Sequence, residues 1–445
     1  MSDEHRPDCA LDRRGFLVRG GLAVGAGAVL GALRPRPAQA DESARAATGT
    51  APSSWADVKA QFALAPGLAH MSAFFLASHP RVVREALEAH RRGLDDNPYE
   101  YVEANIGRLE TAVRAAAGAY AGAGPDDLAL TDSTTAGLGI VYGGVHMRPD
   151  QEILSTTHDH IVTTTACDLR ARRSGVAVRR VSLYDDPARA SVAAIVDALV
   201  QAVRPPTRVV AVTWVHSGTG VKLPIRAIAD GLARVNAGRA PADRALLCVD
   251  GVHGFGIEDE KLPELGCDVF VAGCHKWILG PRGTGLVWAR AETWRVIDAS
   301  TPSIDPMWRT GPPESLPAAA LMSPGGFHSF EHRWALEPAF RLLLSLGKAR
   351  VAERIHALNR HVRAELAKMP RVRVVTPQAD ELASGITCFS VEGLSPPETV
   401  ARLKAKGIVA SVTPGFYRPA YTRLAASLAT LEPDVERALT AVRSL

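Results

Sequence analysis

The chain has 445 residues, 47% of them hydrophobic and 22% charged, and its formal net charge is only +4. That length can build more than one domain with a sizeable core, and the composition is ordinary for a soluble globular protein. The arginines are scattered and form no basic stripe with interleaved aromatic residues, so the sequence predicts no nucleic-acid partner.

The first forty residues predict an export signal and not a part of the fold. Twin arginines at positions 13–14 precede a Gly- and Ala-rich apolar stretch (16–33), and AQA at 38–40 matches an A-x-A cleavage pattern. This pattern resembles a twin-arginine (Tat) signal, which implies the Tat export machinery as a partner and a periplasmic or secreted mature chain beginning near Asp41. The alternative is a retained membrane anchor, although the stretch is short and its glycines dilute its hydrophobicity.

Residues 41–65 are predicted to be a linker, because they are rich in Ala, Ser and Thr. Helical periodicity follows over 81–93 and 103–120, and short apolar runs then alternate with helices. Such alternation predicts an α/β fold with a mostly parallel sheet between crossover helices. The predicted strands span 127–132, 152–156, 177–183, 208–215, 245–250, 269–272 and 284–289, and the helices between them include 190–204 and 224–235.

The last third of the chain predicts a smaller α+β domain. Residues 302–326 are rich in Pro and Gly and predict a long loop, whereas 335–369 predicts a helical block. We therefore predict a large domain over 66–330 and a small C-terminal domain over 331–445. The small domain is expected to contain strands at 372–375, 386–391 and 408–412 and a helix near 433–444.

The cysteines predict neither a disulfide framework nor a metal site. Five remain after removal of the signal, and their odd number and wide spacing argue against paired disulfides. Their spacing to histidines matches no zinc site. The five are Cys167, Cys248, Cys267, Cys274 and Cys388, and three of them lie in predicted buried strands, where a cysteine usually acts as a small hydrophobic residue.

Two polar residues stand at the ends of neighbouring apolar runs. Asp250 ends ALLCVD (245–250), and Lys276 follows CDVFVAGCH (267–275). Ligands bind outside the carboxyl ends of strands in open α/β sheets, so the acid and the amine are predicted to share a site. Partial burial there would lower the pKa of Lys276. Pyridoxal phosphate (PLP) needs a lysine for its aldehyde and an acid for its pyridine nitrogen, so the pair predicts this cofactor.

From about Met71 to its end the chain resembles the class V, fold-type I PLP-dependent enzymes, most closely the isopenicillin N epimerase-like branch. The resemblance rests on the order and spacing of VDGVHGFG (249–256) and CDVFVAGCHKWILGPRGTGLVW (267–288). It implies that Lys276 forms the Schiff base and later acts as general base at the substrate Cα, and that Asp250 pairs with the ring nitrogen. It also implies a homodimer with active sites at the subunit interface.

The same resemblance assigns three histidines to the ring of the cofactor. His253 would lie near the phenolic oxygen, and His160 would stack on the pyridine, with His158 as a competitor for that role. His216 would contact the phenolic oxygen, with Ser217 as the adjacent alternative. For His253 the competing interpretation is a structural histidine satisfied by the backbone.

Two further motifs are assigned to anionic groups. In TDSTTAG (131–137) a strand ends and a helix can begin, an arrangement that suits phosphate. The resemblance implies that Ser133, Thr134 and Thr135 hold the phosphate, although an ordinary capping cluster would look the same. Arg423 in YTRLAAS (421–427) would grip the substrate α-carboxylate bidentately, unless it is a surface arginine.

Three places depart from the pattern of the family. Gly273 stands where a hydroxyl residue is frequent, Trp334-Ala335 replace a Gly-Thr pair that caps phosphate from the neighbouring subunit, and Ala429-Thr430 replace an Asn-Thr pair. Side chains that could supply what the missing threonine does are His328, His332 and Arg333.

PLP alone permits epimerisation, transamination, β-elimination or desulfuration, and the protein selects among them. Desulfurases of this class carry a nucleophilic cysteine on a loop before the C-terminal arginine, but residues 410–423 contain none. We therefore predict an enzyme acting at the Cα of an amino acid or its derivative, most like an epimerase, with an aminotransferase or a C–S/β-elimination lyase as alternatives. A catalytically silent PLP-fold binding protein is the non-enzyme alternative, and a nicotinamide oxidoreductase lacks its glycine fingerprint.

Overall fold

The computed structural model describes residues 52–309, 312 and 315–445, so the predicted export signal (1–40) lies outside the described residues. These described residues belong to one compact unit. Within the described ranges, the helices are too short or too polar to cross a membrane. The predicted boundary near residue 330 between a large and a small domain stays a prediction.

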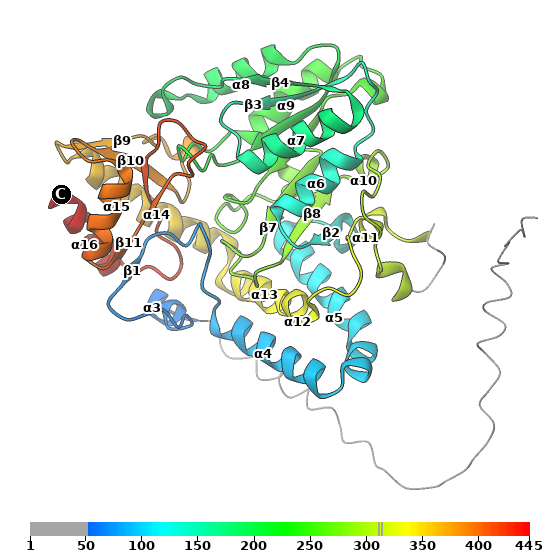
Figure 1. Ribbon diagram of the computed structural model, residues 1–445, viewed down its shortest axis with the longest axis horizontal. Helices are drawn as coiled ribbons and strands as arrows, with labels where there is room; N and C mark the ends of the chain where they lie inside the picture. The colour runs from blue at the N-terminus through cyan, green and yellow to red at the C-terminus, as the bar shows by residue number, and fades with distance from the viewer. Residues whose placement is uncertain (1–51, 310–311, 313–314) are drawn as a thin grey trace, which may run out of the picture. The chain divides into compact units, whose positions relative to one another are not determined.

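A seven-stranded sheet forms the centre of this unit (Figure 1). Strands β3 to β7 run parallel to one another, and β8 is antiparallel to both of its neighbours, β7 and β2. The prediction of a mostly parallel sheet is therefore confirmed. In sheet order the strands are β2 (Leu128–Thr131), β8 (Gly285–Ala289), β7 (Val269–Gly273), β6 (Leu246–Asp250), β5 (Thr207–Thr213), β3 (Glu152–Thr156) and β4 (Ala177–Val181).

Helices cover both faces of the sheet, which explains why its inner strands are apolar along their whole length. Val209 and Ala211 of β5 join one buried cluster with α6 (Thr134–Gly144) and α7 (Ile161–Ser174). Val210 and Val212, which point the opposite way, join the larger cluster. That cluster includes residues of α5 (Pro98–Ala121), α8 (Val192–Ala202), α9 (Ile225–Asn236) and α13 (Leu336–Leu346).

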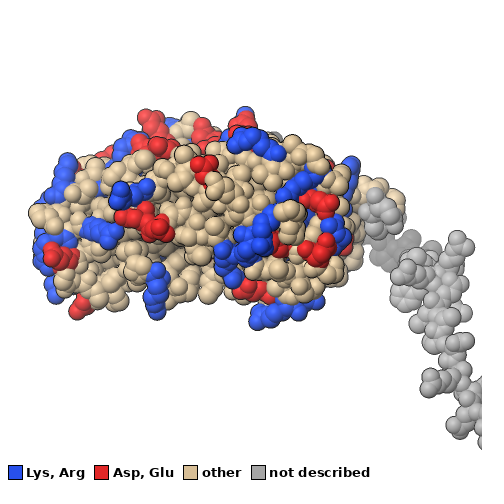
Figure 2. All heavy atoms as spheres, turned by 90° about the horizontal axis from the view of Figure 1, so that it is seen from above, with Lys and Arg blue, Asp and Glu red and all other residues tan. Residues whose placement is uncertain are grey.

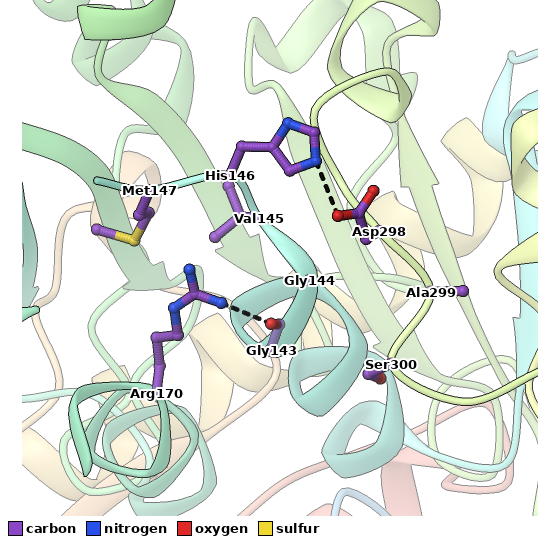
Figure 3. A pocket seen from close by; sticks show the side chains of 9 residues that line it. All are labelled: Gly143, Gly144, Val145, His146, Met147, Arg170, Asp298, Ala299 and Ser300. Atoms are coloured by element: carbon purple, nitrogen blue, oxygen red, sulfur yellow. Dashed lines mark hydrogen bonds and ion pairs between the residues drawn. The ribbon is translucent and has the colours of Figure 1, made fainter. Parts of the chain in front are cut away.

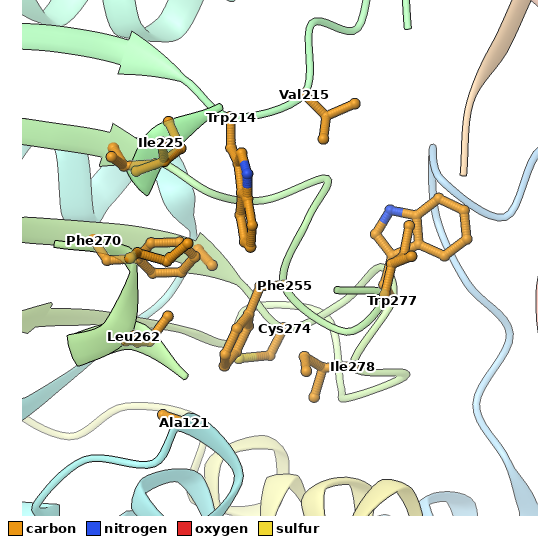
Figure 4. Close-up of a cluster of buried hydrophobic side chains, with 14 of the residues drawn as sticks. Ala121, Trp214, Val215, Ile225, Phe255, Leu262, Phe270, Cys274, Trp277 and Ile278 are labelled. Carbon is orange, nitrogen blue, oxygen red and sulfur yellow. The ribbon is translucent and has the colours of Figure 1, made fainter. Parts of the chain in front are cut away.

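The larger cluster continues to the strand ends where Lys276 lies. Trp277 and Ile278, directly after this lysine, are both buried in it, and Figure 4 shows them near Cys274 and Phe255. Burial of such large apolar side chains stabilises a fold by roughly 1.5–3 kcal/mol each. The segment that carries the amine is therefore anchored on its C-terminal side.

A second, antiparallel sheet of four strands lies in the C-terminal part. Its order is β12 (Ser411–Val412), β13 (Thr422–Leu424), β10 (Thr387–Val391) and β9 (Val372–Val374). The single strand predicted at 408–412 is divided, because β11 (Ile408–Val409) pairs instead with β1 (Ala69–His70). The helices packed around this part are α14 (Lys348–Ala367), α15 (Pro396–Ala405) and α16 (Glu432–Arg443).

Further predicted segments differ from the structure, and one of them is the long loop predicted over 302–326, which contains α11 (Ala318–Leu321). The helical block 335–369 breaks at Gly347, whose φ of 84° ends α13 and precedes α14. The predicted linker 41–65 contains α3 (Trp55–Lys59), whose Val58 is fully buried in the core. The remaining helices are α4 (Arg81–Asp96), α10 (Ala291–Trp294) and α12 (Phe330–Trp334).

Candidate active site

The residues predicted for the site gather at one edge of the central sheet. Because β2 runs in the same direction as β3, β5, β6 and β7, the carboxyl ends of these five strands share that edge. Each strand is followed there by a segment that the sequence singled out. In sheet order the residues on these segments are Ser133 and Thr134, Lys276, Asp250 and His253, His216, and His160.

Asp250 is almost fully buried at the end of β6. One carboxylate oxygen accepts a hydrogen bond from Thr163 Oγ1 at 3.1 Å, and the other accepts one from the Val252 N–H at 3.3 Å. Burial raises the pKa of Asp250, and the positive charge of Lys276 opposes that rise. Thr163, on α7, is a partner that the sequence reasoning missed, and its place one helical turn after His160 is the only signal that could have revealed it.

Lys276 places its amine beside His253. Lys276 Nζ lies 3.4 Å from His253 Nε2. Burial lowers the pKa of Lys276 to about 8, with Arg423 adding to the decrease and Asp250 opposing it. The other ring nitrogen of His253, Nδ1, is buried and has no hydrogen-bond partner among the described residues.

His160 and His158 have different surroundings. His160 caps α7 by accepting the Val162 N–H at 3.3 Å, and burial together with the charges of Lys276 and Arg423 lowers its pKa to about 4. His158 stacks on Tyr184 with 3.9 Å between ring centroids. Of the two histidines, His160 is therefore the one whose pKa the charges of Lys276 and Arg423 lower.

His216 is fully buried after β5. Its Nδ1 lies 2.7 Å from the hydroxyl of Tyr184, while its Nε2 has no partner within the described part of the chain. The alternative residue, Ser217, is already engaged, because its Oγ accepts a hydrogen bond from Arg423 Nη1 at 2.7 Å. His216 Nε2 is thus free to contact a ligand, while the Ser217 hydroxyl keeps only its own proton for donation.

The predicted phosphate motif forms the start of α6. Ser133 Oγ caps the helix by accepting the Ala136 N–H at 3.1 Å, and Thr134 Oγ1 accepts the Gly273 N–H at 2.8 Å. Both hydroxyl groups keep their own proton for donation, and the first turn of a helix favours an anion. Thr135 is exposed.

Arg423 is buried on β13 and is well supported. It donates to Ser411 Oγ, to the backbone oxygen and Oγ of Ser217, and to the Val412 carbonyl. Its guanidinium also lies over the ring of Phe74, 4.6 Å from the centroid. Since a guanidinium has five N–H groups, these four bonds leave one free, so a bidentate grip on a carboxylate requires Ser217 or Ser411 to give way.

Asp159 is a second buried carboxylate that the sequence reasoning missed. It accepts the Thr156 N–H at 2.6 Å and the Thr213 N–H at 2.7 Å, which ties the end of β3 to the end of β5. Burial raises the pKa of Asp159 to about 6. Its place between two histidines in HDH is a signal that could have found it.

The residues proposed to replace the missing threonine are occupied elsewhere. His328 Nε2 lies 3.3 Å from Glu110 Oε1, and Arg333 approaches the other oxygen of Glu110 at 3.8 Å. His332 Nδ1 lies 2.8 Å from the Arg282 carbonyl. In the described chain, these side chains make structural contacts.

The arrangement fits PLP. It combines an amine of lowered pKa, a buried carboxylate without a directly bonded cation among the described residues, and hydroxyl groups at a helix start. Buried nitrogens of His253 and His216 remain unpaired in the described part of the chain, and a ligand would satisfy them. The described residues contain no cluster of His, Cys, Asp and Glu suited to a metal ion.

A separate hollow of about 350 Å³ lies at the other end of α6 (Figure 3). Several of its polar groups are paired with each other, since His146 Nε2 lies 3.0 Å from Asp298 Oδ2 and Arg170 Nη1 donates to the Gly143 carbonyl at 2.7 Å. It contains none of the residues that the sequence singled out.

Comparisons with known proteins agree with this geometry. The family model "Aminotransferase class-V" matches residues 102–430. Isopenicillin N epimerase of Streptomyces clavuligerus is 26% identical over 412 residues, which cover 88% of this chain and 98% of that protein.

Two solved structures confirm the predicted fold class. C-DES with glycine covalently linked to its PLP cofactor has a TM-score of 0.78 at 20% identity, covering 87% of this chain and 99% of that chain. Cysteine desulfurase CsdA of Escherichia coli has a TM-score of 0.71 at 18% identity, covering 87% and 97%. At these identities the likeness concerns the fold.

Proposed function

The chain belongs to the class V aminotransferase family, and we propose that it acts at the Cα of an amino acid or an amino-acid derivative, most like an epimerase. Membership of this family confirms that the chain is an enzyme and that its cofactor is PLP. When bound, PLP withdraws electrons from the bonds at the substrate Cα.

The residues of the chain have separate tasks in this proposal. Lys276 holds the cofactor and exchanges a proton with the substrate Cα, because its lowered pKa leaves much of the amine neutral near pH 8. Asp250 keeps the ring nitrogen protonated by lying close to it as a buried anion. Ser133 and Thr134 donate hydrogen bonds to the phosphate at the start of α6.

Other side chains orient the ring and the substrate. His160 stacks on the ring, while His253 and His216 use their unpaired nitrogens to contact its phenolic oxygen. Arg423 binds the α-carboxylate with its free N–H and with a second N–H that Ser217 or Ser411 gives up. The single observation that carries the proposal is that the partly buried Lys276 amine and the buried Asp250 carboxylate follow adjacent strands, where each charge shifts the pKa of the other.

A persulfide mechanism is disfavoured, which separates the proposal from desulfuration. Every described cysteine is buried. Cys388 lies on β10 opposite Arg423, and burial raises the pKa of its thiol to about 12. A thiol is a poor nucleophile unless it is ionised. A C–S lyase remains the second candidate, since C-DES, which shares the fold, is a cystine C–S lyase.

The proposed function is tested with the purified mature chain and PLP. We expect a yellow protein in which borohydride fixes a pyridoxyl group on Lys276, as located by mass spectrometry. Amino acids are then incubated in deuterated water. Deuterium at Cα without loss of the amine indicates epimerisation, keto-acid formation indicates transamination, and release of sulfide or persulfide indicates the lyase.

The test variant and its matched control remove one lysine each. Lys276→Ala should abolish the borohydride adduct and all exchange, whereas Lys261→Ala, which removes an exposed lysine paired with Glu264, should retain both. A protein that stays colourless with PLP, or a Lys276→Ala variant with unchanged turnover, contradicts the proposal.

We also propose that the chain forms a homodimer and is exported by the Tat machinery. Large apolar side chains that are more than two-thirds exposed, including Phe75, Tyr99 and Phe327, offer apolar surface that a second subunit would cover. On the face shown in Figure 2 basic and acidic side chains are interspersed. Light scattering tests the dimer, and periplasmic fractionation of a fusion carrying residues 1–40, with the two arginines replaced by lysines as control, tests the export.

A further inference from the structure

The segment between β12 and β13 forms a small closed loop over residues 413–421. Its ends are joined twice, since the Thr413 N–H donates to the Tyr421 carbonyl and the Tyr421 N–H donates to Thr413 Oγ1, both at 2.9 Å. Compact surface loops whose ends are held together in this way are frequently functional. Arg423, the proposed carboxylate-binding residue, follows two positions later on β13.

Two aromatic residues of this loop face the site in different ways. Phe416 is 41% exposed, and its ring meets His160 edge-on with 5.3 Å between centroids. Tyr417 is turned inward against Gly218, where an added Cβ would lie only 2.6 Å from its ring. Gly218 adjoins Ser217, which accepts a hydrogen bond from Arg423, so Tyr417 packs one residue away from a partner of the carboxylate-binding group.

The hydroxyl of Tyr417 is buried and has no hydrogen-bond partner among the described residues. A buried hydroxyl that stays unpaired costs free energy, so such a group in a native protein calls for an explanation. Burial raises the pKa of Tyr417 far above its usual value, with Asp159 and Asp250 adding to the rise and Arg423 opposing it. The hydroxyl therefore keeps its proton and can donate a hydrogen bond, and the charges of Asp159, Asp250 and Arg423 affect its pKa.

We propose that the loop 413–421 is a lid over the site, and that the Tyr417 hydroxyl donates a hydrogen bond to the side chain of the bound substrate. The cofactor already has partners at the strand ends, whereas Tyr417 comes from the Arg423 side, where the substrate carboxylate is proposed to bind. This inference rests on the proposed function and adds a substrate class to it. The class is an amino acid whose side chain ends in a hydrogen-bond acceptor, either a carboxylate or an amide.

The test compares the PLP-loaded protein with its Tyr417→Phe variant. This variant keeps the ring against Gly218 and removes one oxygen, so it is expected to fold. Tyr421→Phe is the matched control, because it removes a hydroxyl from the end of the same loop. Titration of the cofactor absorbance with L-glutamate, L-glutamine and L-norvaline gives the affinity for an acid, an amide and an apolar side chain of similar length.

We expect the native protein and Tyr421→Phe to bind glutamate or glutamine about tenfold more tightly than norvaline. In Tyr417→Phe this preference should disappear while norvaline binding is unchanged. A second readout does not depend on activity. Chymotrypsin should cut after Phe416 in the PLP-loaded protein, and the preferred amino acid should protect this bond in the native protein but not in Tyr417→Phe.

The outcomes separate this inference from the proposed function. Protein that never binds PLP contradicts the proposed function itself. If PLP binds and Lys276 forms the borohydride adduct, but Tyr417→Phe keeps the native preference and protection, the lid inference is wrong and the proposed function stands. Loss of PLP affinity in Tyr417→Phe without a change in preference would assign the hydroxyl to the cofactor and would equally overturn the inference.

Discussion

At the scale of single residues, burial decides the chemistry of Lys276. The amine lies at a strand end with Trp277 and Ile278 buried behind it, so its charged form loses hydration. The carboxylate of Asp250 offsets only part of that loss, and the pKa of Lys276 falls to about 8. A neutral amine is therefore available near neutral pH, as capture of an aldehyde requires.

We expect the rate of PLP capture by the cofactor-free protein to depend on this pKa. Lys276 is protonated below pH 8 and neutral above it, so the rate should rise with pH, with a midpoint near 8, and then level off. Stopped-flow absorbance between pH 6.5 and 10 measures it. In Asp250→Asn, which loses the opposing charge, the midpoint should move lower. A midpoint near 10.5 in the native protein would show that the amine is hydrated.

At the scale of elements, one glycine divides the helical block that links the central sheet to the C-terminal sheet. Gly347 has φ 84° and ψ 123°, a backbone conformation in which residues with a Cβ are strained. The break allows α13 to pack on α5 while α14 packs on β9 and α16. Helical periodicity runs through the break, so the pattern of apolar residues does not reveal it.

Gly347→Ala should lower the free energy of unfolding by about 1–3 kcal/mol, because alanine is strained at this φ and ψ. Gly139→Ala is the matched control. Gly139 is an exposed residue inside α6 with open space around it, so alanine there should stabilise the protein by about 0.5–1 kcal/mol. Urea unfolding followed by circular dichroism measures both, and equal effects of the two variants would refute the argument.

At the scale of the whole described chain, the buried Glu258 joins its own segment to three distant ones. It accepts hydrogen bonds from Lys222 Nζ at 2.9 Å and Ser384 Oγ at 2.5 Å, and it lies 3.2 Å from His356 Nε2. His356 belongs to α14, and Lys222 follows β5. Burial favours the protonated acid, but His356 and Lys222 outweigh it and hold the pKa of Glu258 below its usual value.

Replacing this carboxylate by an amide should weaken the whole unit. Glu258→Gln leaves the mostly buried Lys222 ammonium without its counter-charge, which should cost about 3 kcal/mol of unfolding free energy at pH 7. The matched control is Glu264→Gln, which removes an exposed ion pair with Lys261. It should lower the free energy of unfolding by less than about 1 kcal/mol.

The effect of Glu258→Gln should also depend on pH in a definite direction. A carboxylate whose pKa is lowered on folding stabilises the protein above its unfolded pKa of about 4.5, and this contribution disappears as the pH falls. The difference between the native protein and Glu258→Gln should therefore shrink below pH 4.5. A difference that stays constant from pH 7 to pH 3.5 would contradict the assigned role of the charge.

Local sequence determined the strands of the central sheet and the position of the acid and the amine at their ends. Continuous apolar runs ending in a polar residue are visible without any tertiary information, because strands buried on both faces need them. Asp250, Lys276 and the start of α6 could therefore be predicted to within a few residues. The resemblance of two motifs to a family supplied the histidines and Arg423.

Only the tertiary structure decided what each of these residues contacts. Arg423 is held by Ser217, 206 positions away, and β13 itself is a three-residue strand too short to show a pattern. Thr163 and Asp159, which follow β3, act by reaching the ends of β6 and β5, and Tyr417 acts by folding its loop back onto Gly218. Periodicity records which face of an element is buried, whereas the partner on that face depends on how distant segments pack.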